Sequence, residues 1–447
     1  MSPLSPLRTA PRAALWLAAA CLTLLMLAAP ARAETEITEV TSPGGLTAWL
    51  VEEPSIPFLA LEIRFKGGAS LDAPGKRGAI NLMTGLLEEG AGGRDARAFN
   101  EAREDLAASF GFRAYDDSLA ISAKMLTENR AEALALLRDA LIDPRFDQDA
   151  IDRVRAQVMA NIRSDARDPD AIASATFNRL AFGDHPYATD RTGTAETVAA
   201  LTREDLLAAK DRVMARDRIY ISAVGDVTAE ELGPLLDDLL GDLPATGAPL
   251  PGPAPINLTG GTTVVDFATP QSVVLFGHEG MTRDDPDFFA AYLLNTILGG
   301  SGFNARLMTE VREKRGLTYG VYAYLVPKDH AALYLGSVSS ANDRVAEAIE
   351  VIRDVWADTA QNGVTAEELT AAKTYLTGAY PLRFDGNGPI ADILVGMQMD
   401  DLPIDYAATR NARVNAVTLE EVNRIAARLL RPEALHFVVV GQPDGLM

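Results

Sequence analysis

Two segments of the chain share one pattern of apolar and polar positions. Residues 201–225 and 417–441 each begin near a threonine followed by acidic residues, continue with apolar residues at helical spacing, and end in a β-rich run that closes on glycine. A threonine before acidic residues is typical of a helix N-terminus, and a short apolar run before glycine is typical of a buried strand. The pattern therefore predicts one helix–strand unit that occurs twice.

Further matches extend this repeat. Residues 129–141 (NRAEALALLRDAL) parallel 343–356 (DRVAEAIEVIRDVW), and GAINLMTGLLEEG resembles AAYLLNTILGGSG more loosely. The run VVLFGHEG predicts a strand, and TYGVYAYLV with AALYLGSV predicts a hairpin. Strands and helices do not alternate strictly, as they would in a doubly wound fold. We therefore expect the α+β class, with two homologous domains that are each an antiparallel sheet with helices packed on one face.

A proline-rich stretch separates the two halves. Residues 247–255 read GAPLPGPAP, and four prolines in nine residues exclude a regular helix or a central strand. We expect an N-terminal domain over 34–246, a linker over 247–256 and a C-terminal domain over 257–447.

The first 33 residues have the features of a secretory signal. A basic start is followed by an apolar run from Ala13 to Ala29 and by Ala-Arg-Ala at 31–33. We expect cleavage and export; an uncleaved membrane anchor is the alternative, because the run approaches spanning length. Cleavage would remove the one cysteine, Cys21, and would change the net charge from −21 to −24. Such a negative field opposes binding to nucleic acid.

The sequence lacks the common catalytic motifs. The four histidines (His185, His278, His330 and His436) are never three to five residues apart, so no helix presents a histidine pair to zinc. We expect His436 to be structural; for His185 and His278 a metal role is the alternative. There is no nucleophile elbow, phosphate loop or dinucleotide fingerprint. The glycines of LGGSG (Gly299, Gly300 and Gly302) form either a flexible turn or a loop that approaches a peptide backbone closely.

The segment LGGSGFNARLMTEVREKRGLTYGVYAYL resembles the C-terminal half of insulinase/pitrilysin-type metallopeptidases, a family that includes the mitochondrial processing peptidase. The likeness extends over nearly the whole chain after residue 33, and includes KRGAINLMTGLLEEGAG, GDHPYATDRTGTAETV and DDLPIDYAAT. It implies the clam-like, two-domain fold of the processing peptidases, with an unfolded peptide as substrate.

Active members of this family carry H-x-x-E-H on a helix, in which two histidines bind zinc and the glutamate activates water, and a second glutamate later in the chain completes the ligands. The resemblance places the five motif positions at residues 81–85, which hold Asn81, Leu82, Met83, Thr84 and Gly85, and the distal position at Asn161. None of these side chains suits zinc. We expect no metal on this chain, and Glu88 and Glu89 to be solvated acids at a helix end.

The same resemblance implies a function for Arg312 and Tyr319 in REKRGLTY. Locally, we expect a helix from Leu307 to Lys314, a C-cap at Gly316 and a strand that starts at Tyr319, so that Arg312 and Tyr319 face one site. In the family this pair hydrogen-bonds the peptide carbonyl and stabilises the charge that develops on it. Without the motif, the two would be a surface arginine and a strand-packing tyrosine.

Bacterial members of the family often occur as paired chains, one with the zinc and one with the Arg–Tyr pair. The main hypothesis is therefore a zinc-less subunit of a periplasmic heterodimer, inactive alone, that holds peptide in extended form beside a zinc-bearing partner. The alternatives are a peptide-binding or scaffolding protein without proteolytic activity, and a stand-alone hydrolase with an unrelated site.

Overall fold

A computed structural model describes residues 36–300 and 304–446 of the chain. The segment expected to be a signal (1–33) and Gly302 lie outside the described residues. Within the described part, one compact unit begins at Ile37. None of the helices described there is both long enough and apolar enough to span a bilayer.

The first half of the chain forms a six-stranded sheet in the order β1-β2-β8-β3-β7-β6, which we call the first sheet. Its strands are β1 (Thr38–Thr41), β2 (Thr47–Glu52), β3 (Phe58–Lys66), β6 (Ser109–Ala114), β7 (Ser118–Leu126) and β8 (Ile219–Gly225). The helices of this half are α2 (Ala79–Thr84), α3 (Ala96–Asp105), α4 (Arg130–Ile142), α5 (Gln148–Asp165), α6 (Pro169–Phe182), α7 (Ala195–Ala199), α8 (Arg203–Val213) and α9 (Ala229–Leu240). A short hairpin of β4 (Gly90–Ala91) and β5 (Arg94–Asp95) precedes α3.

The second half forms a five-stranded sheet in the order β11-β12-β10-β13-β9, the second sheet. Its strands are β9 (Gly261–Asp266), β10 (Gln271–Glu279), β11 (Val321–Pro327), β12 (Ala332–Ala341) and β13 (His436–Gly441). Its helices are α10 (Phe288–Gly299), the π-helix η5 (Met308–Glu313), α11 (Val345–Asn362), α12 (Ala366–Ala379), the short turn η6 (Tyr380–Arg383), α13 (Asn387–Met399), α14 (Tyr406–Ala416) and α15 (Leu419–Leu429). The predicted β11–β12 hairpin is confirmed, with antiparallel register from Val321↔Val338 to Pro327↔Ala332.

The helix–strand repeat is confirmed in both halves. In the first it is α8 followed by β8, and in the second it is α15 followed by β13. Thr202 caps α8 and Thr418 caps α15, each in a reciprocal capping box with the acid three residues later. Both strands also end in a glycine at positive φ, Gly225 at 142° and Gly441 at 157°. A Cβ at Gly225 would lie 2.1 Å from the carbonyl oxygen of Phe58, which explains why glycine closes the unit.

The α+β class with two related halves is confirmed. Most strand pairs are antiparallel, but each sheet also contains one parallel pair, β2–β8 in the first and β9–β13 in the second. No helix or strand occurs between α9 and β9, as the prolines predict. That connection is nevertheless anchored: the amide of Ala248 bonds to Arg212 O at 2.9 Å, and the amide of Ala254 bonds to His330 O at 2.7 Å. The domain boundaries at 246 and 257 stay predictions.

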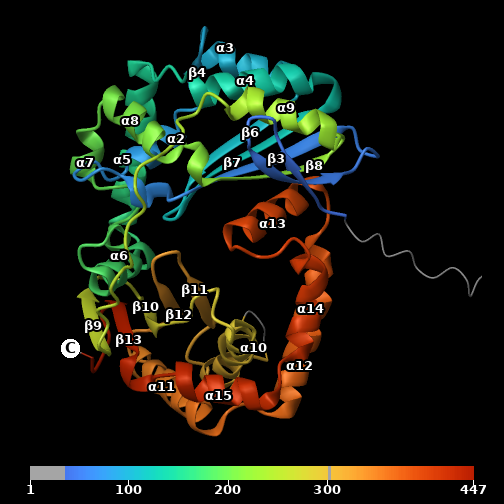
Figure 1. The fold of residues 1–447 in the computed structure, drawn as a ribbon. Coiled ribbons are helices and arrows are strands. Elements are labelled where there is room, and N and C mark those ends of the chain that lie inside the picture. The colour runs from blue at the N-terminus through green and yellow to red at the C-terminus, as the bar shows by residue number, and fades with distance from the viewer. Residues whose placement is uncertain (1–35, 301–303, 447) are drawn as a thin grey trace, which may run out of the picture. The chain divides into compact units, whose positions relative to one another are not determined.

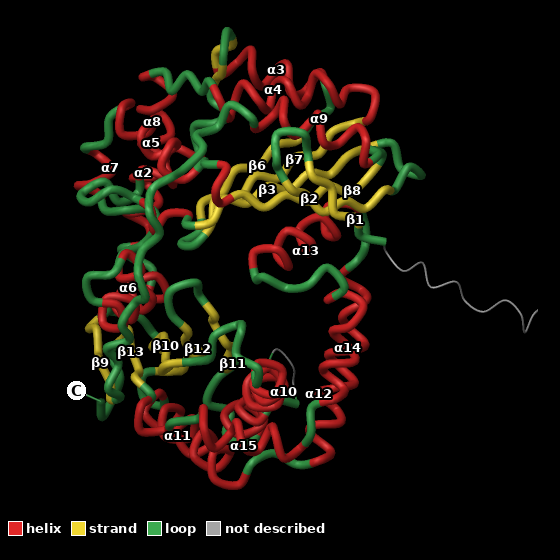
Figure 2. Tube along the Cα trace, in the orientation of Figure 1, coloured by secondary structure: helices red, strands yellow, loops and turns green. Residues whose placement is uncertain are grey.

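Each sheet also receives a helix from the opposite half of the chain. Along β8, Ile221 and Ala223 face the core beneath α4 and α9, whereas Val224 packs with Ala391 and Leu394 of α13. Because alternate residues of a strand point to opposite faces, α13 covers the second face of the first sheet. Figure 1 shows α13 there, and in Figure 2 the strands of this sheet separate it from α3, α4 and α9.

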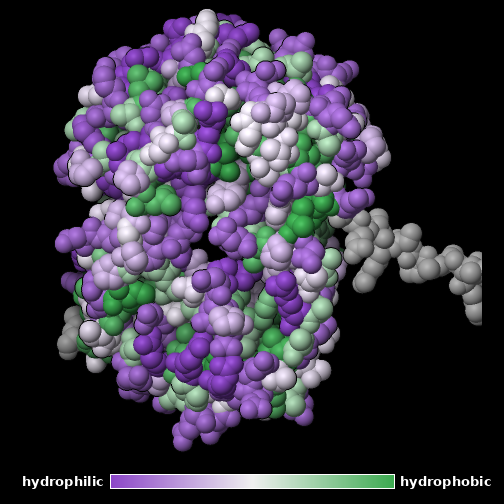
Figure 3. All heavy atoms as spheres, viewed as in Figure 1, coloured by the Kyte–Doolittle hydropathy of each residue, from purple (hydrophilic) through white to green (hydrophobic). Residues whose placement is uncertain are grey.

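The second sheet is covered in the same way by a helix of the first half. Phe437 and Val439 of β13 point into the core with α11 and α15, while Val438 and Val440 pack against Phe177 and other residues of α6. Each sheet therefore has the expected helices on one face. Its other face is covered by one helix from the opposite half of the chain, α13 on the first sheet and α6 on the second. The surface of the molecule is largely hydrophilic on the side drawn in Figure 3, in keeping with the high charge.

Candidate functional site

Arg312 lies in a π-helix rather than in a regular α-helix. The element η5 spans Met308–Glu313, within the helix predicted over 307–314. The amide of Lys314 bonds to Thr309 O, five residues back, at 3.0 Å. This wider turn is rare, and it occurs frequently at functional sites. Sequence periodicity does not distinguish one π turn from an α turn, so the prediction of a helix was right but its register was missed.

Gly316 ends this helix as the sequence predicts. Its φ is +60°, in the left-handed region, and its amide donates to Arg312 O at 2.8 Å. The next residue, Leu317, is buried and donates its amide to Val311 O at 3.0 Å. These two bonds fold the chain back on the helix, and they fix the segment that follows Arg312.

Tyr319 lies in a turn, which corrects the prediction that it starts a strand. The strand β11 begins two residues later, at Val321. The hydroxyl of Thr318 donates to Ser339 O at 2.7 Å and accepts the amide of Gly320 at 3.1 Å, so these side-chain bonds replace strand pairing around Tyr319. The hydroxyl of Ser340 also fixes the turn by donating to Leu317 O at 2.6 Å. The Tyr319 side chain is 89% exposed and projects from a backbone that is held on both sides.

The charged neighbours of Arg312 are engaged in local ion pairs. Glu310 accepts from Lys314 at 2.6 Å and from Arg315 at 2.8 Å. Hydrogen bonds from these two cations lower the pKa of the Glu310 carboxyl. Arg344 donates to Arg315 O at 3.1 Å and so braces the turn from outside. The half-buried Arg312 therefore belongs to a segment whose backbone is stabilised by the contacts of Glu310 and Arg344.

The glycines predicted to approach substrate have a clear packing role where they are described. Gly299 ends α10 and is buried, and a Cβ there would lie 2.6 Å from Ala323 Cβ on β11. At Gly300 a Cβ would lie 2.9 Å from Thr296 Cα. The close approach of α10 and β11 is thus a sufficient reason for a glycine at position 299, and no ligand is needed to explain it. A contact of Gly299, Gly300 or Gly302 with peptide stays a prediction.

The positions that match the zinc motif lie on two packed helices. Asn81 and Thr84 belong to α2, Gly85 follows that helix directly, and Asn161 is on α5. A Cβ at Gly85 would lie 3.1 Å from Val154 of α5, so the two helices meet there. The Thr84 hydroxyl is buried and donates to Asn81 O at 2.8 Å, while Asn161 accepts from Gln157 at 3.0 Å. These amide and hydroxyl groups do not form a zinc ligand set.

The two acids after α2 are paired with arginines. Glu88 contacts Arg103 at 3.3 Å, and Glu89 pairs with Arg153 of α5. Burial raises the pKa of the Glu88 carboxyl, and the charge of Arg103 opposes this shift. Both acids are therefore ion-paired and only partly solvated, which corrects the simpler expectation. Over residues 36–300 and 304–446, no three His, Cys, Asp or Glu side chains are grouped closely enough to hold a metal ion.

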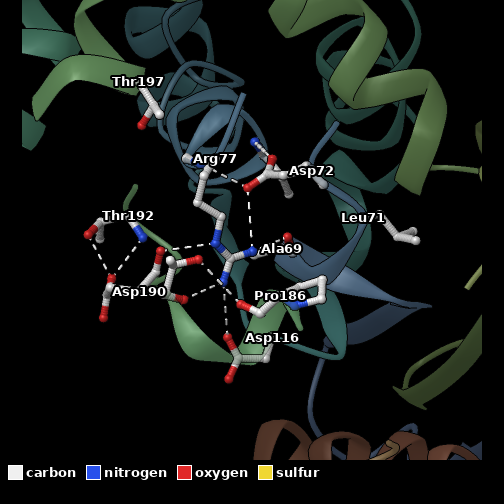
Figure 4. A network of polar contacts seen from close by, with 12 residues as sticks. Ala69, Leu71, Asp72, Arg77, Asp116, Pro186, Asp190, Thr192 and Thr197 are labelled. Atoms are coloured by element: carbon white, nitrogen blue, oxygen red, sulfur yellow. Dashed lines mark hydrogen bonds and ion pairs between the residues drawn. The ribbon is translucent and has the colours of Figure 1, made fainter. Parts of the chain in front are cut away.

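A network centred on Arg77 holds the start of α2 (Figure 4). The guanidinium donates to the carbonyl oxygens of Ala69, Thr189 (2.8 Å) and Asp190 (3.1 Å), and it lies 3.6 Å from the carboxylate of Asp72. Asp72 in turn accepts the amides of Gly78 at 2.8 Å and Ile80 at 2.9 Å, at the N-terminus of the helix. The Arg77 network thus still supports α2, the helix that carries the zinc motif in active members, although this chain lacks the zinc ligands.

Sequence reasoning missed this network, although KRG and GDHPYATDRTG were both used for the resemblance. The signal was present as two glycines. Gly78 and Gly193 have φ of 95° and 80°, and a Cβ at either would meet the other segment within 2.5 Å, at Thr192 O or Arg77 O. Close packing of these two backbones requires glycine at both positions.

The histidines make structural contacts. His436 contacts Thr263 Oγ1 at 3.0 Å and Gly260 O at 2.9 Å, as expected of a satisfied strand histidine. His278 is buried, and its Nε2 accepts the indole N–H of Trp356 at 3.1 Å. His185 accepts the amide of Tyr187 at 3.2 Å.

Comparisons with known proteins agree with this arrangement. The family described as Insulinase (Peptidase family M16) matches residues 48–194, and the Peptidase M16 inactive domain matches 200–376. A Helicobacter pylori protein named Non-peptidase homolog YmxG is 25% identical over 390 residues, covering 87% of this chain and 90% of that protein. A Streptomyces coelicolor protein named Uncharacterized zinc protease SCO5738 is 25% identical over 408 residues, covering 88% and 87%.

The likeness also holds in three dimensions. The crystal structure of a peptidase M16 inactive domain from Pseudomonas fluorescens has a TM-score of 0.85 at 29% identity, covering 92% of this chain and 98% of that one. Two family matches, full-length relatives and a shared two-half fold all point the same way, and the motif positions hold no zinc ligands. This chain therefore belongs to the M16 peptidase family, as an inactive homologue of its peptidases.

Proposed function

We propose that this chain is the zinc-less subunit of a heterodimeric, periplasmic metallopeptidase, in which Arg312 and Tyr319 act on a peptide held against the zinc of a partner subunit. The observation that carries the proposal is the turn after η5. A π-helix, a left-handed glycine and three side-chain-to-backbone bonds brace a tyrosine that is 89% exposed. An exposed aromatic side chain on a braced turn is suited to contact another molecule.

The chemistry required of the pair follows from amide hydrolysis. When water adds to the peptide carbonyl carbon, negative charge develops on the carbonyl oxygen. Arg312 supplies a fixed positive charge with directional N–H donors, and the Tyr319 hydroxyl supplies one more donor. Donors placed before the reaction stabilise that oxyanion more than they stabilise the ground state. The partner's zinc would supply the activated water, which this chain's own residues do not provide.

Reconstitution tests this function. The full chain is mixed with a homologous subunit that carries H-x-x-E-H, and cleavage of a quenched fluorescent peptide is followed with each subunit alone and together. The proposal expects cleavage in the mixture, abolition by a chelator, and background rates for this chain alone. Equal cleavage by the partner with and without this chain would contradict it.

A binding role without proteolysis is the second candidate. It is favoured by the printed name of the Helicobacter pylori relative, Non-peptidase homolog YmxG. Under this alternative the same braced turn would contact a peptide or an assembly partner, and no cleavage would appear in any mixture. The reconstitution assay separates the two candidates, because only the first predicts turnover.

A further inference from the structure

Four arginines line a cavity of about 580 Å³ among α10, α13, α14 and the end of β11. We call it the arginine cavity, after Arg64, Arg283, Arg383 and Arg410. Its volume falls in the range of roughly 300–1,000 Å³ that is usual for small-ligand sites. Tyr292 and Tyr380 add aromatic walls. The cavity lies apart from the braced turn, and the proposed function does not use it.

Arg410 is the most unusual of the four. It is 6% exposed, on the inner face of α14, and no carboxylate lies within 4.0 Å of it among the described residues. Its Nη1 donates to Leu376 O at 3.2 Å and to Asn411 Oδ1 at 3.0 Å, both uncharged acceptors. The guanidinium also lies 4.2 Å from the Tyr380 ring centre. A buried guanidinium ordinarily needs a negative partner, because desolvation of a charge is costly.

Helix α12 explains part of the stability of this buried charge. Leu376 is in the last turn of α12, where exposed carbonyl groups carry partial negative charge. Arg410 therefore caps that helix with one of its two terminal nitrogens. Its Nη2 and Nε form no hydrogen bond with the described residues, so these two donors stay available to a ligand in the cavity that Arg410 lines.

The other two inward arginines are already neutralised. Arg64 contacts Glu62 at 2.7 Å and Asp392 at 2.6 Å. Arg283 contacts Asp400 at 3.4 Å. Within the described ranges Arg383, an exposed residue of the turn that starts at Tyr380, has no such acid. The positive charge without a carboxylate partner is thus concentrated around Tyr380, on Arg383 and Arg410.

The acids of the cavity do not supply the missing partner. Asp392 and Asp400 are held by Arg64 and Arg283, and Asp329 contacts Lys66 at 3.6 Å. Asp117 accepts the hydroxyl of Tyr187 and the amide of Asp329. A negative group from outside the chain would therefore meet unneutralised charge at Arg383 and Arg410, although the protein as a whole carries a formal charge of −21.

We propose that Arg410, assisted by Arg383, binds a carboxylate of a peptide, with the Tyr292 and Tyr380 rings packing against the neighbouring part of that ligand. A guanidinium binds a carboxylate through paired N–H donors, and the planar aromatic faces suit an apolar side chain beside it. The inference rests on the proposed peptide-handling function and adds an anchor point away from Arg312. Peptide C-termini and Asp or Glu side chains present the same group.

Equilibrium dialysis of the full chain with three labelled peptides tests the proposal. The first probe is acetyl-Ala-Ala-Tyr-Leu with a free C-terminal carboxylate, the second is its C-terminal amide, and the third is an amide in which glutamate replaces leucine. The free acid should bind about tenfold or more tightly than the amide, as expected for charge-assisted hydrogen bonds. Preference for the third probe over the first would assign the site to acidic side chains.

Three variants locate the effect. Arg410→Gln should bring the acid-to-amide ratio close to one. Arg383→Gln, at an exposed position that the fold does not need, should lower the ratio by about two- to fivefold. Arg167→Gln removes the same charge at an exposed position in the turn after α5, which does not line the arginine cavity, and should leave the ratio unchanged.

Three results would overturn the proposed carboxylate site. They are equal binding of the free acid and its amide, binding of neither peptide, and an unchanged acid-to-amide ratio in Arg383→Gln. The use of Arg383→Gln keeps the test decisive even if Arg410→Gln fails to fold. None of these results involves cleavage. Failure of the anchor is therefore distinct from failure of the proposed function, which is measured with the partner subunit.

Discussion

The amide of Gly316 donates to the carbonyl oxygen of Arg312 at 2.8 Å, and this bond ends the π-helix. Three residues after Gly316 the chain presents Tyr319 to solvent. The backbone between the two proposed functional side chains is therefore set by one left-handed glycine and by the hydroxyls of Thr318 and Ser340.

Replacement of Gly316 by alanine tests this backbone control. No atom lies within 4 Å of the position of the added Cβ, so the cost comes from the +60° φ alone, about 1 kcal/mol of unfolding free energy. Urea unfolding measures it. Gly378→Ala is the matched control, because Gly378 lies within α12 with equally open space and should be neutral or stabilising. Equal effects of the two substitutions would refute a conformational role for Gly316.

Arg77 should be the more important residue for stability. Its side chain is 12% exposed, and Arg77→Ala would remove three hydrogen bonds to carbonyl oxygens and the ion pair with the buried Asp72 carboxylate. We expect a loss of about 3 kcal/mol or more by urea unfolding. Arg97→Ala, which removes a solvent-exposed pair with Glu101, should cost less than about 1 kcal/mol. Similar losses in both variants would show that the Arg77 network does not support α2.

His278 should make the protein sensitive to acid. Burial lowers the pKa of its imidazole from 6.5 to about 4. A histidine that is harder to protonate when folded contributes its full stability above pH 6.5, and that contribution is lost as the pH falls towards 4. Between pH 7.5 and pH 5 we expect a loss of about 2 kcal/mol from this residue. Urea unfolding of the wild type and of His278→Gln at the two pH values isolates it, since the variant cannot titrate there. An identical pH dependence in the two proteins would contradict the assignment.

Local patterns predicted much of the fold. The capping threonines Thr202 and Thr418 and the strand-ending glycines stand at matching places in both halves, so the duplicated unit was readable from spacing alone. The helix before Gly316 was predicted for the same reason, because the left-handed C-cap has a local residue signature. The hairpin of β11 and β12 likewise follows from two adjacent apolar runs.

The features that the sequence did not predict depend on distant partners. The exchange of α6 and α13 between the halves is set by packing against Val440 and Val224, which lie more than a hundred residues away in the chain. The turn at Tyr319 replaced a predicted strand because the hydroxyl of Thr318 bonds to Ser339 of β12. Glu88 is paired and not simply solvated because the fold brings Arg103 beside it. Propensity and periodicity carry no information about such contacts.

The most direct measurement compares cleavage rates of the reconstituted pair with variants of this chain. Tyr319→Phe removes one hydroxyl from an exposed side chain, and Tyr322→Phe does the same at a neighbouring exposed tyrosine. Arg312→Ala and Arg315→Ala form the second matched pair, the latter losing only its local pair with Glu310. Loss of a donor to the oxyanion should lower kcat by about 10²–10³ for Tyr319→Phe and for Arg312→Ala, with both controls near the wild-type rate. Full cleavage by Tyr319→Phe and Arg312→Ala would contradict the central claim.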